Sequence, residues 1–246
     1  MYGKSIVEIK KEFERIKRLG WVKSVAEGYC GIGLTLEKLL NIPRNDLEIP
    51  DLGTFELKSR NIFSNSYVSL FNCGVEGPYF KGTERLKDLY GYRYSKDKKY
   101  KVLISSVYSN FKIKVGLFYY FKLKVDRANR KIFLLVFDIH GKLIEDDVFW
   151  SFDLLEEKVS RKLHNLALFG ALKNNRNDGT YYKYVDFNFY EFKKFDYFID
   201  AIERGIIRIT FKVGVFTSGK RIGQIHDHGT SFEIKEDDLL FLYKKL

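Results

Sequence analysis

The chain has 246 residues, of which 45% are hydrophobic, so it is long and apolar enough to bury a core and is neither disordered nor fibrous. Its 43 Lys and Arg residues against 32 Asp and Glu residues give a formal net charge of +11, which favours nucleic acid as a partner but also fits RNA-binding and membrane-surface proteins. The two isolated cysteines, Cys30 and Cys73, predict neither a disulfide framework nor a cysteine zinc site. The sequence has no apolar run near the roughly 20 residues that span a bilayer and no signal peptide, so we expect a cytoplasmic protein without a membrane partner.

The first part of the chain is predicted to form two helices followed by two strands. Apolar residues recur at helical spacing from Ile6 to Leu19, and a second short helix around Leu36 to Leu40 must end before Pro43. Residues 54–59 alternate as a strand does, and residues 67–71 are expected to form the neighbouring strand across a turn at 61–66. This order predicts a curved sheet flanked by helices.

The remaining elements continue this mixture of helix and strand. Residues 111–125 and 131–137 are expected to pair as a hairpin, followed by a helix from Asp153, in the N-cap position, to about Leu163. A helix over 189–204 should end at Gly205, and further strands are expected at 167–173, 181–187 and 206–216. Residues 218–228 form a basic loop punctuated by glycine, and a lobe boundary is expected between Tyr94 and Tyr100.

The segment from Pro50 to Ser59 carries the most informative pattern. In a strand, Glu56 and Lys58 point to one face about 7 Å apart, while Leu57 points to the other face, into the core. Asp51 can place its carboxylate beside that of Glu56 across a turn at Gly53. Two carboxylates and the backbone carbonyl of Leu57 would offer the oxygen ligands that Mg²⁺ prefers, with Lys58 next to a phosphate.

This arrangement suits phosphodiester hydrolysis, which needs an activated water and neutralisation of the charge that develops in the transition state. Unperturbed Asp and Glu titrate near roughly 3.9 and 4.3, so both are ionised at neutral pH and are better metal ligands than proton donors, which disfavours a glycosidase. The spacing alone is a loose pattern in a chain with 30% charged residues, and a solvated surface remains an alternative reading.

The chain repeats the same spacing at Asp186, Glu191 and Lys193. There the surrounding phenylalanines recur at helical spacing, and positions two apart on a helix diverge by about 200°. We therefore predict that Glu191 and Lys193 lie on a solvated helix face and form no site.

Several segments carry a family resemblance in the same order along nearly the whole chain. The run Gly31 to Leu40, followed by Pro50-Asp51-Leu52-Gly53 and Glu56-Leu57-Lys58-Ser59, resembles the active-site region of the MvaI/BcnI restriction endonucleases and of the related nicking enzyme MutH. The later matching segments are Phe149-Trp150-Ser151-Phe152-Asp153, Tyr181-Tyr182-Lys183-Tyr184, and Ser218-Gly219-Lys220 with His226-Asp227-His228-Gly229-Thr230.

The resemblance implies an α/β (α+β) fold of the PD-(D/E)xK type, with a mixed sheet flanked by helices and two lobes around a cleft for DNA. Residues 1–100 would form the catalytic lobe, and residues 101–246 would form mainly the recognition lobe, part of it packing on the catalytic core. It further implies Mg²⁺-dependent cleavage of double-stranded DNA at a short specific sequence, with 5′-phosphate and 3′-hydroxyl ends. The enzyme would act as a monomer, with a cognate methyltransferase encoded separately.

The resemblance also assigns roles to individual residues. Asp51 and Glu56 match the metal-binding carboxylates, Lys58 matches the catalytic lysine, and Glu37 matches a further acidic residue near the metal. On helix patterning alone, Glu37 also reads as a solvated helix residue.

Residues of the C-terminal part are expected to bind DNA. In an alternating segment His226 and His228 share one side while Asp227 faces away, which argues against a metal site made of all three. The resemblance implies instead that this segment recognises bases in the major groove. Lys220 and Arg221 are expected to bind phosphate. Lys212 and Glu233 occupy positions where MvaI has arginine, so we carry over the reaction but not the recognised sequence.

Two alternatives remain at this point, a MutH-like enzyme that nicks one strand and a DNA-binding protein without catalysis. Tyrosines at 119, 120, 181, 182 and 184 could stack on single-stranded bases, although packing within a sheet is the favoured interpretation.

Overall fold

The computed structural model describes residues 6–28, 30–42, 51–52, 54–64, 67–93, 99–216 and 219–246. The chain divides into two compact units, each assembled from separate stretches of sequence. Unit 1 comprises Met1–Val68, Val159–Lys193 and Lys235–Leu246, and unit 2 comprises Ser69–Lys158 and Lys194–Ile234. This division differs from the single boundary expected near residue 100, because strands from the second half of the chain complete the sheet of unit 1.

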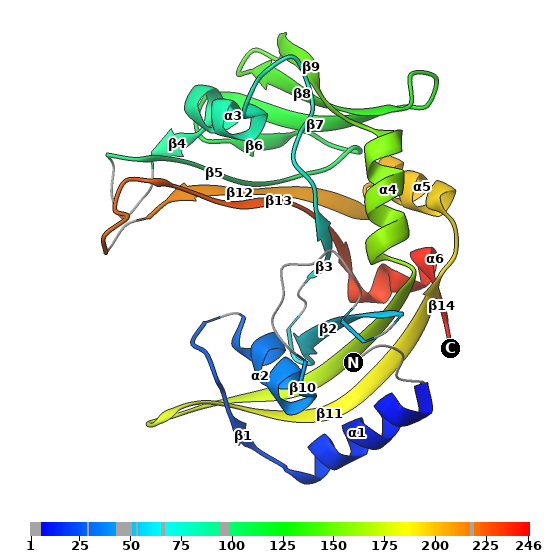
Figure 1. The fold of residues 1–246 in the computed structure, drawn as a ribbon. Coiled ribbons are helices and arrows are strands. Elements are labelled where there is room, and N and C mark those ends of the chain that lie inside the picture. Colours follow the sequence, from blue (N-terminus) through cyan, green and yellow to red (C-terminus); the bar gives the residue numbers. More distant parts are fainter. Residues whose placement is uncertain are drawn as a thin grey trace. The chain divides into compact units, whose positions relative to one another are not determined.

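Unit 1 contains a mixed sheet in the order β1(Val22–Lys23), β11(Gly179–Phe192), β10(Asn165–Arg176) and β2(Phe55–Asn61), with β14(Tyr243–Lys245) also pairing with β11. Figure 1 shows the long β10 and β11 side by side, in yellow-green and yellow. Strand β2 is parallel to β10, with Leu57 opposite Ala167, and it lies at the end of the strand order. The short helices η1(Glu236–Asp238) and α6(Leu239–Leu242) lead into β14.

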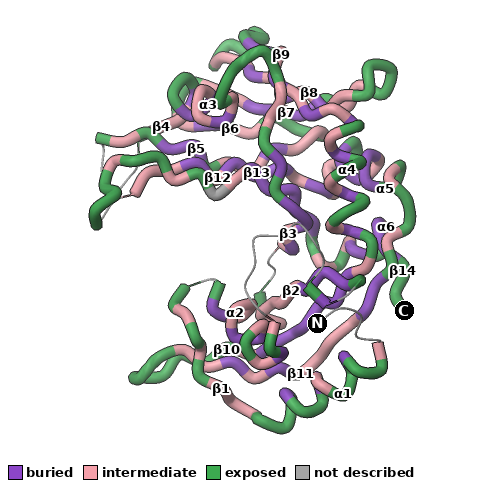
Figure 2. The backbone as a smooth tube through the Cα atoms, in the orientation of Figure 1, coloured by how far each residue is buried: buried purple, intermediate pink, exposed green. Residues whose placement is uncertain are grey.

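One face of this sheet is covered by α1(Ile6–Arg18) and α2(Gly31–Leu39). Apolar residues at helical spacing on α1, among them Phe13, pack against Phe169 and Phe187 of the sheet, with ring centroids 5.5 and 4.3 Å apart. Phe55 and Leu57 of β2 belong to the same buried cluster. Figure 2 shows that β10 is buried over part of its length as well. The alternation of β2 therefore places Glu56 and Lys58 on the opposite face.

Unit 2 contains two sheets. The first has the order β3(Tyr67–Asn72), β13(Ile225–Lys235), β12(Ile207–Val215), β5(Lys101–Val107) and β4(Tyr92–Arg93), and the second is β6(Ile113–Val115), β7(Tyr119–Asp126), β8(Lys131–Asp138) and β9(Leu143–Ser151). Buried aromatic side chains, including Trp150, Phe211 and Phe232, pack in this unit. Its helices are α3(Gly82–Tyr90), α5(Phe195–Glu203) and most of α4(Phe152–Lys162), whose last turn belongs to unit 1.

The hairpin expected between 111–125 and 131–137 is confirmed by the pairing of β7 with β8, although its first strand is divided at residues 116–118 into β6 and β7. The strands predicted at 54–59, 167–173, 181–187 and 206–216 are confirmed by β2, β10, β11 and β12. The pairing expected between 54–59 and 67–71 is wrong, since β2 pairs with β10 whereas β3 lies beside β13 in another sheet. The expectation that both N-terminal helices precede the first strand is also wrong, because the two-residue strand β1 lies between α1 and α2. Such pairings are set by distant segments, which local periodicity does not reveal.

The helix predicted over 189–204 begins only at Phe195. Residues 189–192 extend β11 instead, because Phe189 pairs with Ala167 on one side and Phe192 pairs with Tyr243 on the other. Two smaller corrections concern element ends. Ser151, whose Oγ accepts a hydrogen bond from the Leu154 N–H, caps α4 in place of Asp153, and β13 starts at Ile225 within the stretch expected to be loop.

Among the described residues, no helix combines the length and the apolar character that crossing a membrane requires. Cys30 is exposed, Cys73 is buried, and neither forms a disulfide in the described part of the chain. Tyr182 and Tyr184 are buried, and the Tyr184 hydroxyl donates to the carbonyl of Ile32 at 2.7 Å. These two tyrosines therefore pack within the core, as favoured over base stacking.

Candidate active site

A tight turn places Asp51 beside strand β2. Leu52 and Phe55 exchange backbone hydrogen bonds of 2.9 and 3.1 Å, so the chain folds back on itself just before the strand. The Asp51 carboxylate then accepts a hydrogen bond of 3.0 Å from the backbone N–H of Leu57. Pro50 and Gly53, which the sequence pattern included, lie outside the described residues.

Glu56 and Lys58 form an ion pair on the face of β2 away from the apolar core. Lys58 Nζ lies 2.8 Å from Glu56 Oε1, and Glu56 is only 7% exposed. The other carboxylate oxygen, Glu56 Oε2, is buried and has no hydrogen-bond partner among the described residues. A buried acceptor left in this state costs free energy unless a further group binds it.

A second lysine approaches the same carboxylate from the last turn of α4. Lys162 Nζ lies 3.7 Å from Glu56 Oε2. The sequence reasoning missed this residue, because Arg161 and Lys162 at the end of a helix are typical of side chains that interact with the helix dipole. The available signal was the basic end of α4 immediately before β10, the strand that pairs with β2.

The electrostatics of the cluster centre on Asp51. Burial raises the pKa of the Asp51 carboxyl above its ordinary value, and the neighbouring Glu56 carboxylate adds to this effect. The Leu57 N–H, Lys58 and Lys162 act in the opposite direction without cancelling it. The Glu56 carboxylate thus lies close enough to disfavour the ionised form of Asp51, a situation that a bound cation relieves.

Glu37 occupies a different environment from this cluster. Its carboxylate and the Ser59 hydroxyl both border Gly33 on α2, and Ser59 alternates onto the same face of β2 as Leu57. The Glu37 charge also contributes to the raised pKa of Tyr184, after burial. Within the part of the chain that the structure describes, no three His, Cys, Asp or Glu side chains are grouped as metal ligands, so Glu37 is not assembled with Asp51 and Glu56 into such a group.

Asp186 and Glu191 lie on β11 and Lys193 directly follows it, so the helix face predicted for Glu191 and Lys193 is wrong. Glu191 is exposed, and Lys193 Nζ donates to the backbone carbonyls of Leu240 and Phe241 at 2.6 and 3.2 Å. The Lys193 ammonium therefore holds the C-terminal segment, which gives a structural role to this second pattern.

Most residues expected to bind DNA lie on the β12–β13 hairpin of unit 2, drawn in orange in Figure 1. Lys220 and Arg221 are exposed in its turn, and the Arg221 guanidinium lies 4.0 Å above the Phe216 ring. His226 stacks on the same ring with a centroid separation of 4.0 Å. Asp227 Oδ1 accepts the Gly229 N–H at 2.7 Å, and the His228 side chain lies outside the described structure.

Glu233 is placed differently from this hairpin turn. It is 4% exposed, and its carboxylate contacts Arg208, Thr210 and Lys212. The carboxylate of Glu233, a residue expected among those that bind DNA, is therefore occupied by protein partners. Lys212, on the same sheet face, keeps a partly exposed side chain.

Comparison with known proteins identifies the class of the chain. Residues 10–243 match the model of the MvaI/BcnI restriction endonuclease family, whereas no curated protein matches the sequence. The structure is similar to the restriction endonuclease MvaI in its cognate DNA substrate complex, with a TM-score of 0.90, 29% identity and coverage of 99% of both chains. It is also similar to MvaI in the absence of DNA, with a TM-score of 0.61, 28% identity and coverage of 100% and 99% of the two chains. The chain therefore belongs to the MvaI/BcnI restriction endonuclease family.

Proposed function

We propose that this type II restriction endonuclease hydrolyses both strands of DNA with Mg²⁺ at the cluster of Asp51, Glu56 and Lys58. The products would carry 5′-phosphate and 3′-hydroxyl ends. The observation that carries the proposal is the Glu56 carboxylate, which is buried against Lys58 while Oε2 lacks a hydrogen-bond partner in the described structure. Double-stranded DNA as the substrate is supported by the similarity to MvaI bound to its cognate DNA.

The donor set of the cluster fits a hard divalent cation. Asp51 and Glu56 supply carboxylate oxygens, which are the ligands that Mg²⁺ prefers. The Leu57 N–H binds Asp51, and the N–H and C=O groups of one strand residue point to the same edge, which supports the Leu57 carbonyl as a further ligand. When bound, the cation would favour ionisation of the attacking water and neutralise charge on the phosphate.

The lysines of the cluster would act on the DNA itself. In our proposal, Lys58 places its ammonium next to the scissile phosphate, where it stabilises the charge that develops as the P–O bond breaks. Glu56 Oε1 positions this ammonium at 2.8 Å. Glu37 stays a predicted acidic residue near the metal, and its carboxylate borders Gly33 on α2 beside the Ser59 hydroxyl.

Recognition is assigned to the β12–β13 hairpin. Lys220 and Arg221 would bind phosphate, while His226, Asp227 and His228 would contact base edges. The recognised sequence stays undetermined, because Lys212 and Glu233 depart from the family pattern. Monomeric action, a cytoplasmic location and a separately encoded methyltransferase remain predictions.

The experiment is a digest of sequenced plasmid DNA with Mg²⁺ or with EDTA. We expect discrete fragments with Mg²⁺ only, and loss of cleavage in the Asp51→Asn and Lys58→Met variants with DNA binding retained. Glu191→Gln is the matched control, since it removes a carboxylate at the equivalent spacing of the second pattern and should cleave as the wild type does. Equal residual cleavage by the Asp51→Asn and Lys58→Met variants would indicate a contaminating nuclease. Circles nicked once but never linearised would indicate a strand-nicking enzyme.

A further inference from the structure

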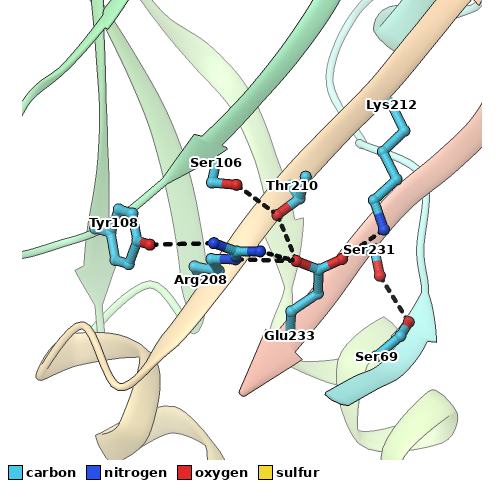
Figure 3. Close-up of polar contacts among 8 residues, drawn as sticks. All are labelled: Ser69, Ser106, Tyr108, Arg208, Thr210, Lys212, Ser231 and Glu233. Carbon is cyan, nitrogen blue, oxygen red and sulfur yellow. Dashed lines mark hydrogen bonds and ion pairs between the residues drawn. The ribbon is translucent and has the colours of Figure 1, made fainter. Parts of the chain in front are cut away.

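One face of the first sheet in unit 2 carries a continuous row of polar side chains (Figure 3). Ser106 of β5, Thr210 of β12 and Ser231 of β13 lie at paired positions, and hydrogen bonds of 2.9 and 2.8 Å join Ser106 to Thr210 and Ser231 to Ser69 of β3. The alternate residues of β12 and β13 form the apolar core on the other face, including Phe211 and Phe232. A sheet buried only for stability has no need of such a row, because polar groups cost free energy when they lose water.

Glu233 lies in this row and is anchored through one of its carboxylate oxygens. Glu233 Oε2 accepts from Arg208 Nε at 2.9 Å and from Thr210 Oγ1 at 2.8 Å, and Arg208 Nη2 is 2.8 Å away. Tyr108 in turn lies 3.5 Å from Arg208 Nη1. Arg208 is directly opposite Glu233 in the strand register, so side chains of the neighbouring strand β12 fix the carboxylate.

The other oxygen of Glu233 binds Lys212, which is the solvent-facing member of the cluster. Lys212 Nζ lies 2.5 Å from Glu233 Oε1, and the Lys212 side chain is 38% exposed. Ile104, its register partner on β5, is 50% exposed, so this end of the polar face is open. An ammonium carries three donors, and Glu233 binds only one of them.

The neighbouring carboxylate favours one of the two DNA contacts open to such a lysine, hydrogen bonding to a base edge over binding to a phosphate. A lysine that binds phosphate acts as a point charge, and a buried anion beside it lowers the local positive charge and weakens that attraction. The same anion fixes the direction in which the remaining N–H groups point. Direction matters for the acceptors of a base edge, where Lys contacts guanine O6 and N7.

We propose that Glu233 is a positioning residue that holds the Lys212 ammonium for hydrogen bonding to a guanine in the recognition sequence. Arg208 and Thr210 anchor Glu233 and make no contact with the DNA. This inference rests on the proposed function, since it presupposes sequence-specific cleavage. It gives Glu233, expected among the DNA-binding residues, an indirect role in recognition.

The test compares recognition sequences rather than activity alone. A randomised duplex library is digested with Mg²⁺ by the wild type and by Glu233→Gln, Lys212→Met and Thr210→Val, and the ends are sequenced. We expect Lys212→Met and Glu233→Gln to lose discrimination at the same base pair, by roughly tenfold to hundredfold, with a raised KM and little change in kcat on the original site. Thr210→Val should produce a weaker form of the same effect.

Glu145→Gln is the matched control for lost stability. Glu145 is another buried carboxylate of unit 2, bound by both Arg85 Nη1 and Nη2 at 2.7 and 3.1 Å. This variant should be less stable but should keep the wild-type recognition sequence.

Two outcomes would overturn the inference. Unchanged discrimination in both Lys212→Met and Glu233→Gln would leave the cluster a purely structural role. Equal weakening of all sequences by Lys212→Met, with a lower salt dependence, would assign Lys212 to phosphate. If Glu233→Gln does not fold, the base discrimination of Lys212→Met tests the base contact, and that of Thr210→Val tests whether the anchoring of Glu233 matters for it. Absence of specific cleavage by the wild type itself would instead reject the proposed function.

Discussion

Lys162 Nζ lies 3.7 Å from Glu56 Oε2, the buried carboxylate oxygen that has no hydrogen-bond partner among the described residues. The two residues come from the end of α4 and from β2, and the parallel pairing of β10 with β2 brings them together. Glu56 is therefore bordered by one ammonium on each oxygen, Lys58 and Lys162. Such a pair of cations would partly offset the repulsion between Glu56 and Asp51 while no metal is bound.

Replacement of Lys162 should reduce the rate of cleavage. Lys162→Met removes a positive charge beside the Glu56 carboxylate. We expect a slower single-turnover rate at saturating DNA, by less than the roughly 10²–10³-fold typical of a group that contacts the transition state directly. Arg161→Gln removes the same charge from the same helical turn and should stay near the wild-type rate. Equal effects of the two substitutions would mean that only the overall charge of the helix end matters.

Glu56→Gln should separate binding from catalysis. The variant loses a carboxylate that we propose binds the metal, so cleavage with Mg²⁺ should be lost. In EDTA, however, it should bind DNA more tightly than the wild type, because a neutral Gln no longer offsets the positive charges of Lys58 and Lys162. Gel-shift titrations in EDTA measure this directly, and weaker binding by Glu56→Gln would contradict the placement of the phosphate next to Lys58.

Salt dependence should distinguish the exposed basic residues of the hairpin turn from Lys212. Lys220→Met is expected to weaken binding to all duplexes equally and to lower the slope of log affinity against log salt by about 1, because one phosphate contact is lost. Fluorescence anisotropy over a range of salt concentrations gives the slope. A wild-type affinity that does not change with salt would argue against DNA as the partner of this basic hairpin.

The stability contributed by Glu233 should depend on pH. Burial alone would raise the pKa of Glu233, but the hydrogen bonds from Lys212, Thr210 and Arg208 outweigh it and hold the pKa below its ordinary value of 4.5. The stabilisation is thus complete above the unfolded-state pKa and is lost as the pH falls through the lower folded-state pKa.

We accordingly expect Glu233→Gln to unfold more easily by about 1–3 kcal/mol at neutral pH, a difference that shrinks in acid. Urea denaturation of both proteins between neutral and acidic pH measures it. A difference that grows as the pH falls would show that the carboxylate is not stabilised in its ionised form.

The sequence by itself determined the parts of the protein that depend on local pattern. The alternation around Glu56 and Lys58 predicted a strand with its core on the other face, and β2 has this arrangement because successive side chains of a strand point to opposite faces. The spacing of Asp51 predicted that its carboxylate returns to the strand, and the turn at Leu52 to Phe55 brings it there. The ordered motifs likewise indicated the family, since they extend over most of the chain.

Only the tertiary structure decided which distant segments meet. Phe189 and Phe192 have helical spacing, yet backbone hydrogen bonds to β10 and β14 on either side stabilise them as strand. Lys162 reaches Glu56 only because β10 pairs with β2, and Glu233 is buried because Arg208 and Lys212 of the neighbouring strand surround it. Local propensity is weak beside the hydrogen bonds and buried area of long-range pairing, and a sequence pattern does not specify the partner strand.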